Sequence, residues 1–184
     1  MPELATAPIL ETPRLILRGH ELSDFDDSAA MWADMSVVKH ISGKLSSHEA
    51  SWSRLLRYSG HWSMLGFGYW VVQAKDDSRF VGEVGFADYR RDIEPSLDGC
   101  PEAGWVLKTA EHGQGFATEA VSRIIEWADR FIDAPSTVCL LDPVHDASIG
   151  VARKVGYTKE GMATYSGQPP LVMSRLKRST AVRR

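Results

Sequence analysis

The sequence predicts a single α+β domain, in which a mixed, mostly antiparallel, twisted sheet of about seven strands is flanked by about four helices. The chain has 184 residues, a length that fits one domain and buries enough surface to fold without disulfides or a metal. Short segments of alternating β-forming residues interleave with longer segments whose apolar residues recur at helical spacing. We therefore predict that residues 1–184 form a single domain, with a core at about 10–176 and a basic tail at 177–184.

Alternation of apolar and polar residues predicts the strands, and apolar residues at helical spacing predict the helices. Strands are expected at residues 14–19, 68–75, 80–90, 102–108, 136–141, 157–163 and 170–176. Helices are expected at residues 22–35, 46–62, 116–132 and 146–156. Ser46 or Ser47 is a suitable N-cap for the second helix, and Trp52, Leu55 and Leu56 are expected to form its inward face.

Composition argues against several classes of protein. The formal net charge of −3 does not suit a chain that coats a polyanion, and no apolar run approaches the roughly 20 residues that span a bilayer. The N-terminus has neither the basic start nor the apolar core of a signal peptide. Cys100 and Cys139 have no patterned spacing, which indicates a reducing, cytoplasmic setting. The six histidines form no metal-binding spacing, so no metal is expected.

The end of the chain is the one compositionally biased region. Its last ten residues, RLKRSTAVRR, carry five basic side chains. They are interpreted either as a solvated chain end or as a contact with an acidic partner or with RNA, such as the ribosome. No other segment indicates a nucleic-acid partner, and the sequence leaves open whether the chain forms a homodimer.

The segment EHGQGFATEAVSRIIEWADRF, residues 111–131, places two glycines directly before a strong helical pattern. The first N–H groups of a helix lack partners within it and carry a partial positive charge. Gly113 and Gly115 allow the backbone to approach a bulky anion such as a pyrophosphate, with Gln114 and His112 as further donors. The loop has no lysine to hold a γ-phosphate, and the P-loop and dinucleotide signatures are absent, so ATP chemistry is not indicated.

Four blocks of the sequence follow one another in an order typical of one enzyme family. They are LETPRLILR, GFGYWVVQAKDDSRFVGEVGF, EAGWVLKTAEHGQGFATEAVSRIIEWA and HDASIGVARKVGYTKEG, at residues 10–18, 66–86, 102–128 and 145–161. Together they resemble the GNAT N-acetyltransferases, and most of all the branch that contains the ribosomal-protein N-terminal acetyltransferases. The resemblance covers roughly residues 10–175.

The resemblance implies acetyl-CoA as co-substrate. In the family a Q/R-x-x-G-x-G/A loop holds the pyrophosphate, and the fourth strand lies beside the pantetheine arm. Here His112 stands at the Gln or Arg position of that loop, and His145 stands at the Asn position of a later N-x-x-S block that ends at Ser148. The CoA-binding residues implied in this way are Trp105, Val106, Leu107, His112, Gly113, Gln114, Gly115, Phe116, Ala117, Thr118, His145 and Ser148.

Acetyl transfer to an amine needs a base for the amine's proton, a donor to the oxyanion and an acid for the departing thiolate. Glu102, at the start of the fourth strand, is the preferred base, and Glu83 on the neighbouring strand is the second candidate. A backbone N–H of the fourth strand would serve the oxyanion. The tyrosine that many family members place on the later helix is replaced here by Ala152, which leaves Ser148 as the candidate acid.

The sequence therefore predicts a cytoplasmic, acetyl-CoA-dependent N-acetyltransferase that acts by direct attack in a ternary complex. Its acceptor is a primary amine of a peptide, a protein N-terminus or a small molecule. Because of the histidine replacements and the missing tyrosine, an acyl-CoA-binding sensor of weak activity is the alternative, and a nucleotide-binding protein of another fold is the third. Acidic residues of the first helix either attract a cationic amine or complement the helix N-terminus; they are Glu21, Asp24, Asp26 and Asp27.

Overall fold

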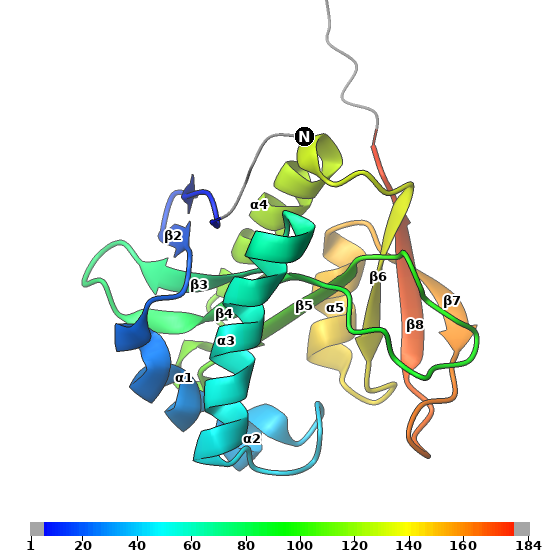
Figure 1. Cartoon of the computed structure of the whole chain (residues 1–184), viewed down its shortest axis with the longest axis horizontal. Helices are drawn as coiled ribbons and strands as arrows, with labels where there is room; N and C mark the ends of the chain where they lie inside the picture. Colours follow the sequence, from blue (N-terminus) through cyan, green and yellow to red (C-terminus); the bar gives the residue numbers. More distant parts are fainter. Residues whose placement is uncertain (1–5, 179–184) are drawn as a thin grey trace, which may run out of the picture.

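The computed structural model describes residues 6–178. An eight-stranded sheet lies at its centre, and helices pack against both faces of that sheet (Figure 1). The strand order is β1-β2-β3-β4-β5-β6-β8-β7. Every neighbouring pair is antiparallel except β5 and β6. The expected α+β domain with a mixed, mostly antiparallel sheet is confirmed.

Seven of the strands lie close to the expected segments, and the short N-terminal strand β1 is additional. Their bounds are β1 Leu10–Glu11, β2 Leu15–Arg18, β3 Tyr69–Ala74, β4 Phe80–Ala87, β5 Glu102–Leu107, β6 Ser136–Leu141, β7 Thr158–Met162 and β8 Leu171–Leu176. The expected strand at 80–90 ends early at Ala87. It ends there because the Asp88 carboxylate accepts a hydrogen bond from the Arg90 backbone N–H at 3.2 Å, and Arg90 adopts a φ of 47°, which turns the chain.

The described chain has five α-helices and two short 3-10 turns. Their bounds are η1 Leu22–Asp24, α1 Phe25–Trp32, α2 Met35–Val38, α3 His48–Leu65, η2 Thr109–Glu111, α4 Phe116–Phe131 and α5 Asp146–Lys154. The expected single helix at 22–35 is wrong. Asp34 divides it, because its carboxylate accepts a hydrogen bond from the Ser36 backbone N–H and caps a separate helix α2.

Helix α3 follows its expected start but not its expected face. Ser47 is the N-cap, with its side chain accepting from the Ala50 backbone N–H. The buried positions are Ser51, Leu55, Tyr58, His61 and Trp62. Trp52 and Leu56 are 41% and 50% exposed, so the prediction that they face inward is wrong. Each lies one residue, or about 100° of helix rotation, beyond the buried stripe.

The sheet is buried on both faces, with one core on each side. On β3, Trp70 and Val72 belong to the core that contains α4, α5 and the end of α3, whereas Val71 packs with α1 and α2, and Tyr69 with the middle of α3. The larger core includes three tryptophans that pack edge to face, with ring centroids 4.6 to 5.4 Å apart: Trp62, Trp70 and Trp127. Strand β5 contributes to both cores, through Ala103 and Leu107 on one face and Val106 on the other.

Part of the basic C-terminal segment belongs to the fold. Arg175 is 6% exposed and forms a two-bonded ion pair with Asp129 of α4, at 2.8 and 2.7 Å. The Lys177 ammonium donates to the Ile132 carbonyl, and the Arg178 backbone N–H donates to Asp129. Lys177 and Arg178 are exposed, but these hydrogen bonds hold them against the end of α4. The rest of the expected tail, residues 179–184, lies outside the described residues.

Candidate functional site

A cavity of about 1440 Å³ lies where β5 and β6 separate. Helices α2, α3 and α5, the loop before α4 and the turn between β7 and β8 contribute to its wall. The residues expected to bind CoA or to catalyse acetyl transfer line this cavity, except Gln114 and the second candidate base, Glu83. The sequence therefore brings distant expected residues to one place.

The separation of β5 from β6 gives the cavity its shape. The two strands run parallel, and their only registered pair is Glu102 with Val138, at the beginning of β5. Beyond Ala103, from Gly104 to Leu107, β5 is paired with β4 on one side and with no strand on the other. A free strand edge of this kind offers N–H and C=O groups to an extended ligand.

The loop before α4 forms a concave group of backbone donors. Gly113 and Gly115 have φ values of 74° and 80°, and Gly115 is the N-cap of α4. None of the backbone N–H groups of residues 113–118 donates a hydrogen bond to another described residue. With the positive end of the helix dipole behind them, these donors suit a phosphate or pyrophosphate.

Side chains of the loop support the loop itself rather than a ligand. The His112 Nε2 atom lies 2.9 Å from the Leu107 carbonyl oxygen. The Gln114 amide donates to the Ala110 carbonyl at 3.0 Å, and Gln114 does not line the cavity. The expectation that the Gln114 side chain faces the anion is therefore wrong, since its hydrogen bond is already made within the loop.

Two ion pairs hold this loop and the first turn of α4 in place. Glu119 of α4 accepts hydrogen bonds from the Thr12 hydroxyl at 2.6 Å and from the Arg14 guanidinium at 2.7 Å. Arg79 forms two bonds to Glu111, at 2.9 and 3.2 Å. The arrangement of donors is thus fixed by the fold before any ligand arrives.

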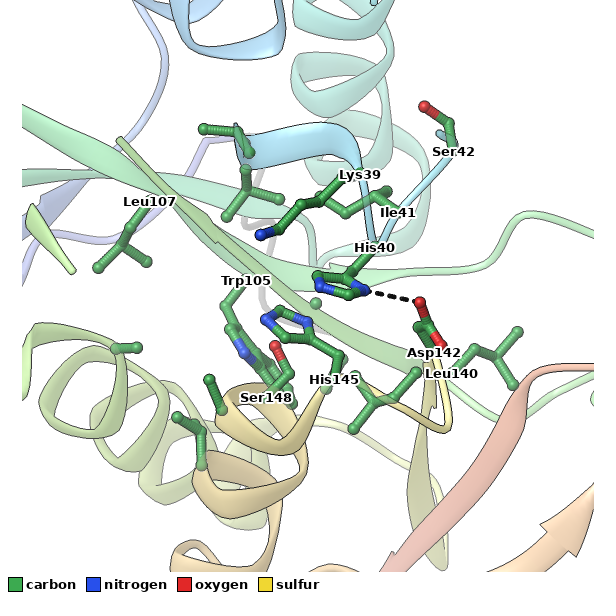
Figure 2. Close-up of a pocket in the computed structure, with 18 of the residues that line it drawn as sticks. Lys39, His40, Ile41, Ser42, Trp105, Leu107, Leu140, Asp142, His145 and Ser148 are labelled. Carbon is green, nitrogen blue, oxygen red and sulfur yellow. Dashed lines mark hydrogen bonds and ion pairs between the residues drawn. The ribbon is translucent and has the colours of Figure 1, made fainter. Parts of the chain in front are cut away.

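A histidine pair lies above the point where the strands separate. The His40 Nδ1 atom of the segment after α2 is 2.7 Å from an Asp142 carboxylate oxygen, and the His40 ring stacks on His145 at 4.3 Å between centroids. Figure 2 shows both rings beside Trp105 and Ser148. Sequence reasoning missed His40 and Asp142 because they are 102 positions apart and belong to no local motif.

Electrostatics favour a neutral His145 and an ionised Asp142. Burial, followed by the nearby His40, lowers the pKa of His145, so its imidazole is uncharged at neutral pH. The hydrogen bond with His40 is the main cause that holds the pKa of Asp142 below its ordinary value. Because the carboxylate occupies Nδ1, the Nε2 atom of His40 is left free of hydrogen-bonded partners among the described residues.

The two carboxylates expected as bases have different surroundings. Glu102 lines the cavity, but both of its oxygens accept hydrogen bonds from Arg91, at 2.9 and 3.0 Å. Glu83 is fully buried and does not line the cavity. Although burial opposes its ionisation, hydrogen bonds from His20, Trp32 and Ser28 lower its pKa below the ordinary value; the Ser28 and Trp32 bonds measure 2.7 and 2.9 Å.

The acidic residues near the first helix do not line the cavity. Asp24 pairs with Arg18 at 2.7 Å, and Asp27 pairs with Lys108 at 3.0 Å. These ion pairs neutralise part of the negative charge that was expected to attract a cationic substrate. Their placement supports the structural role at the helix N-terminus.

Neither a metal site nor a membrane helix is found in residues 6–178. No group of three or more His, Cys, Asp or Glu side chains in this part of the chain is placed to hold a metal ion. No helix in the same range has the length and apolar character that crossing a bilayer requires.

Comparison with known proteins identifies the family. Residues 14–158, more than half of the chain, match the family described as "Acetyltransferase (GNAT) domain". The uncharacterized N-acetyltransferase p20 of Bacillus licheniformis is 25% identical over 154 residues, which cover 83% of this chain and 84% of that protein.

Solved structures share the whole fold. The acetyltransferase from Agrobacterium tumefaciens superposes with a TM-score of 0.78 at 24% identity, covering 92% of this chain and 94% of that one. RimL, a ribosomal L7/L12 α-N-protein acetyltransferase solved with coenzyme A, superposes with a TM-score of 0.74 at 17% identity, covering 92% and 98%. The chain therefore belongs to the GNAT family and is an acetyltransferase whose co-substrate is acetyl-CoA.

Proposed function

We propose that this enzyme transfers an acetyl group from acetyl-CoA to the primary amine of a peptide or small molecule, by direct attack within a ternary complex. The observation that carries the proposal is a single cavity that joins a loop of unpartnered N–H groups, the free edge of β5 and side chains of α3 near the beginning of β5. Its volume of about 1440 Å³ accommodates a pantetheine arm together with an acceptor.

The proposed CoA site uses backbone groups more than side chains. The N–H groups of residues 113–118 would hold the pyrophosphate, and the free edge at Trp105, Val106 and Leu107 would pair with the pantetheine arm. His145 and Ser148, at the beginning of α5, border the same channel (Figure 2). When bound, acetyl-CoA supplies the thioester that reacts with the amine.

Direct attack is favoured because the cavity wall contains no thiol. Neither Cys100 nor Cys139 lines the cavity. Cys139 is buried, and burial raises the pKa of its thiol to about 12, so it is not a thiolate at neutral pH. An acyl-enzyme on cysteine therefore has no suitable nucleophile, and the amine itself is the group that attacks.

For the base we infer His40, positioned by Asp142. With its Nδ1–H donated to the Asp142 carboxylate, His40 presents the Nε2 lone pair over the channel beside Trp105 (Figure 2). Glu102 stays an alternative, although Arg91 already occupies both of its oxygens. Glu83 lies outside the cavity wall, and its contacts support a structural role.

For the acid we retain Ser148 as a proposal. Its hydroxyl lies in the first turn of α5, next to His145 and Trp105 (Figure 2). Ala152, one turn later, is fully buried and has no proton to give. Since a thiolate is a weaker base than an alkoxide, a weak acid or water suffices for its departure.

The test is thiol release from acetyl-CoA across a panel of amines and peptides, combined with melting scans in the presence of CoA or ATP. We expect CoA to raise the melting temperature, ATP to leave it unchanged, and at least one amine to release thiol. CoA binding without thiol release for any amine would favour the sensor alternative. The cytoplasmic location and a homodimer stay predictions.

A further inference from the structure

We propose that the acceptor is a primary amine that also carries an anionic group, a carboxylate or a phosphate, and that Arg54 and Arg57 bind this group. The inference rests on the acetyl transfer proposed above and adds a substrate class to it. It concerns the part of the cavity between α3 and the beginning of β5, here named the acceptor chamber. Its residues are Arg54, Arg57, Tyr69, Tyr89, Arg91 and Glu102.

The acceptor chamber lies apart from the residues assigned to CoA. The loop at 113–118 and the edge at Trp105 to Leu107 lie toward the carboxyl end of β5, whereas Glu102 marks its beginning. An acetyl group carried into the gap between β5 and β6 would therefore meet an amine that enters from the Glu102 side. The side chains of the acceptor chamber are the ones that this amine contacts.

The charges of the acceptor chamber do not cancel. Glu102 is fully engaged by Arg91, which also donates to the Tyr165 hydroxyl at 3.1 Å. Neither Arg54 nor Arg57 forms an ion pair with any residue in the range 6–178. Burial raises the pKa of Tyr89, so its phenol stays neutral and offsets no positive charge. The chamber therefore has a surplus of positive charge.

Arg54 has the features of a group prepared for an anion. Its guanidinium stacks on the Trp32 ring at 3.8 Å and donates one hydrogen bond, from Nη2 to the Ser46 hydroxyl at 3.0 Å. The Nη1 atom is buried and has no hydrogen-bond partner. Burial is the main reason that the pKa of Arg54 lies below its ordinary value, and an anion beside the group would offset this cost of burying the charge.

The nearest buried carboxylate does not satisfy Arg54. The negative charge of Glu83 favours the charged form of Arg54. However, the oxygens of Glu83 accept hydrogen bonds from Ser28 and Trp32 and none from Arg54. A buried guanidinium nitrogen without a partner is unfavourable, so a ligand anion would supply what the protein does not.

The spacing of the two arginines suits one shared anion. Arg54 and Arg57 are three positions apart on α3, so their side chains project from the same face of the helix. Arg57 lies over the Tyr89 ring at 5.2 Å, at the side of the acceptor chamber. Guanidinium groups bind carboxylate and phosphate oxygens through paired hydrogen bonds, which fixes the orientation of the ligand.

The same charges assist the chemistry of the amine. A positive surrounding disfavours the ammonium form and favours the neutral amine, which is the form that attacks. It also disfavours polyamines, which would bring several further positive charges into the chamber. An amine whose positive charge is balanced by its own anion meets no such penalty.

The test compares amines that differ only in the anion. The pairs are α-amino acids with their amides, and phosphoethanolamine with ethanolamine. Binding to the CoA-loaded protein is measured by calorimetry, and transfer is measured as thiol release from acetyl-CoA. The variants are Arg54→Gln, Arg57→Gln and Arg54→Lys, with Arg130→Gln, an exposed arginine of α4 away from the cavity, as the matched control.

We expect at least one anionic member to bind, and to show a kcat/KM, about tenfold or more above its neutral partner. Arg54→Gln and Arg57→Gln should reduce this ratio to less than about threefold, Arg54→Lys should give an intermediate ratio, and Arg130→Gln should keep the full ratio. The carboxylate and phosphate pairs show which anion is preferred.

Two outcomes overturn the proposal: no anionic amine binds more tightly than its neutral partner, or the preference survives in both glutamine variants. If Arg54→Gln fails to fold, Arg57→Gln alone decides. Anion-dependent binding without thiol release would support the acceptor chamber while contradicting the proposed acetyl transfer, so the two failures are distinguishable.

Discussion

Replacing Gly115 by valine tests the proposed pyrophosphate site directly. Gly115 has a φ of 80° and caps α4, and a Cβ atom built there would meet no heavy atom closer than the Arg14 Nη2 atom, at 3.4 Å. There is therefore room for a valine side chain at this position, but the positive φ angle strains the backbone of any residue other than glycine. Its methyl groups would occupy the volume in front of the unpartnered N–H groups of residues 113–118.

The substitution should lower the stability of the protein only slightly, but it should remove most of the stabilisation by CoA. A side-chain-bearing residue in the left-handed region costs about 1–2 kcal/mol, which lowers the melting temperature of a domain of this length by roughly 2–8 °C. CoA at about 100 times its dissociation constant stabilises the native protein by about 2.7 kcal/mol, or roughly 5–11 °C. Losing two charge-assisted hydrogen bonds weakens binding by about 100-fold or more, which leaves a shift of about 1–2 °C at the same CoA concentration.

The assay is a melting scan of each variant with and without CoA, and Gly99→Val is the matched control. Gly99 has a φ of 79°, has no neighbour within 4 Å of an added Cβ, and does not line the cavity. Both variants should lose similar stability without ligand, but only Gly115→Val should lose the shift caused by CoA. A Gly115→Val protein that keeps the full CoA shift would refute the assignment of this loop to the pyrophosphate.

The remaining predictions concern the proton path and the buried carboxylate. His40→Asn should lower kcat by about 10²- to 10⁴-fold with the CoA melting shift retained, and Asp142→Asn should lower kcat less; unchanged steady-state kinetics would remove His40 as the base. Ser148→Ala should lower kcat by about tenfold or less; a change in CoA affinity alone would make the hydroxyl a binding group. Glu83→Gln should destabilise the fold by about 1–3 kcal/mol at pH 7 in urea unfolding. Because folding lowers the pKa of Glu83, this difference should be complete above the unfolded glutamate value of about 4.3 and shrink as the pH falls through the lower folded value; a difference that is independent of pH down to about 3 would contradict it.

The geometry of the loop that we propose for the pyrophosphate could be predicted from the sequence because its signals are local. Gly113 and Gly115 stand directly before a helical repeat, and the backbone geometry that they allow is the geometry found. The side-chain roles in the same loop could not be predicted. Gln114 turned out to bind the Ala110 carbonyl, since a side chain at a turn has backbone acceptors within reach that a sequence pattern does not reveal.

The histidine pair could not be predicted because it depends on tertiary structure alone. His40 follows α2 and Asp142 follows β6, and these two segments meet only in the folded chain. The division of the expected helix at 22–35 is part of the same difficulty. The Asp34 side chain caps a new helix, although the apolar spacing of the sequence continues through this position. The resulting turn brings His40 over the channel.

One half of the cavity presents backbone groups and the other presents side chains, so substitutions should affect the two halves differently. The half proposed for CoA consists of backbone N–H groups and a free strand edge, which side-chain substitutions elsewhere leave intact. The acceptor chamber relies on side chains such as Arg54 and Arg57, carried by α3 on the opposite side of the channel. Substitutions on α3 should therefore change which amine is accepted while the CoA melting shift stays the same. An altered CoA shift in Arg54→Gln or Arg57→Gln, with the fold intact, would contradict this separation.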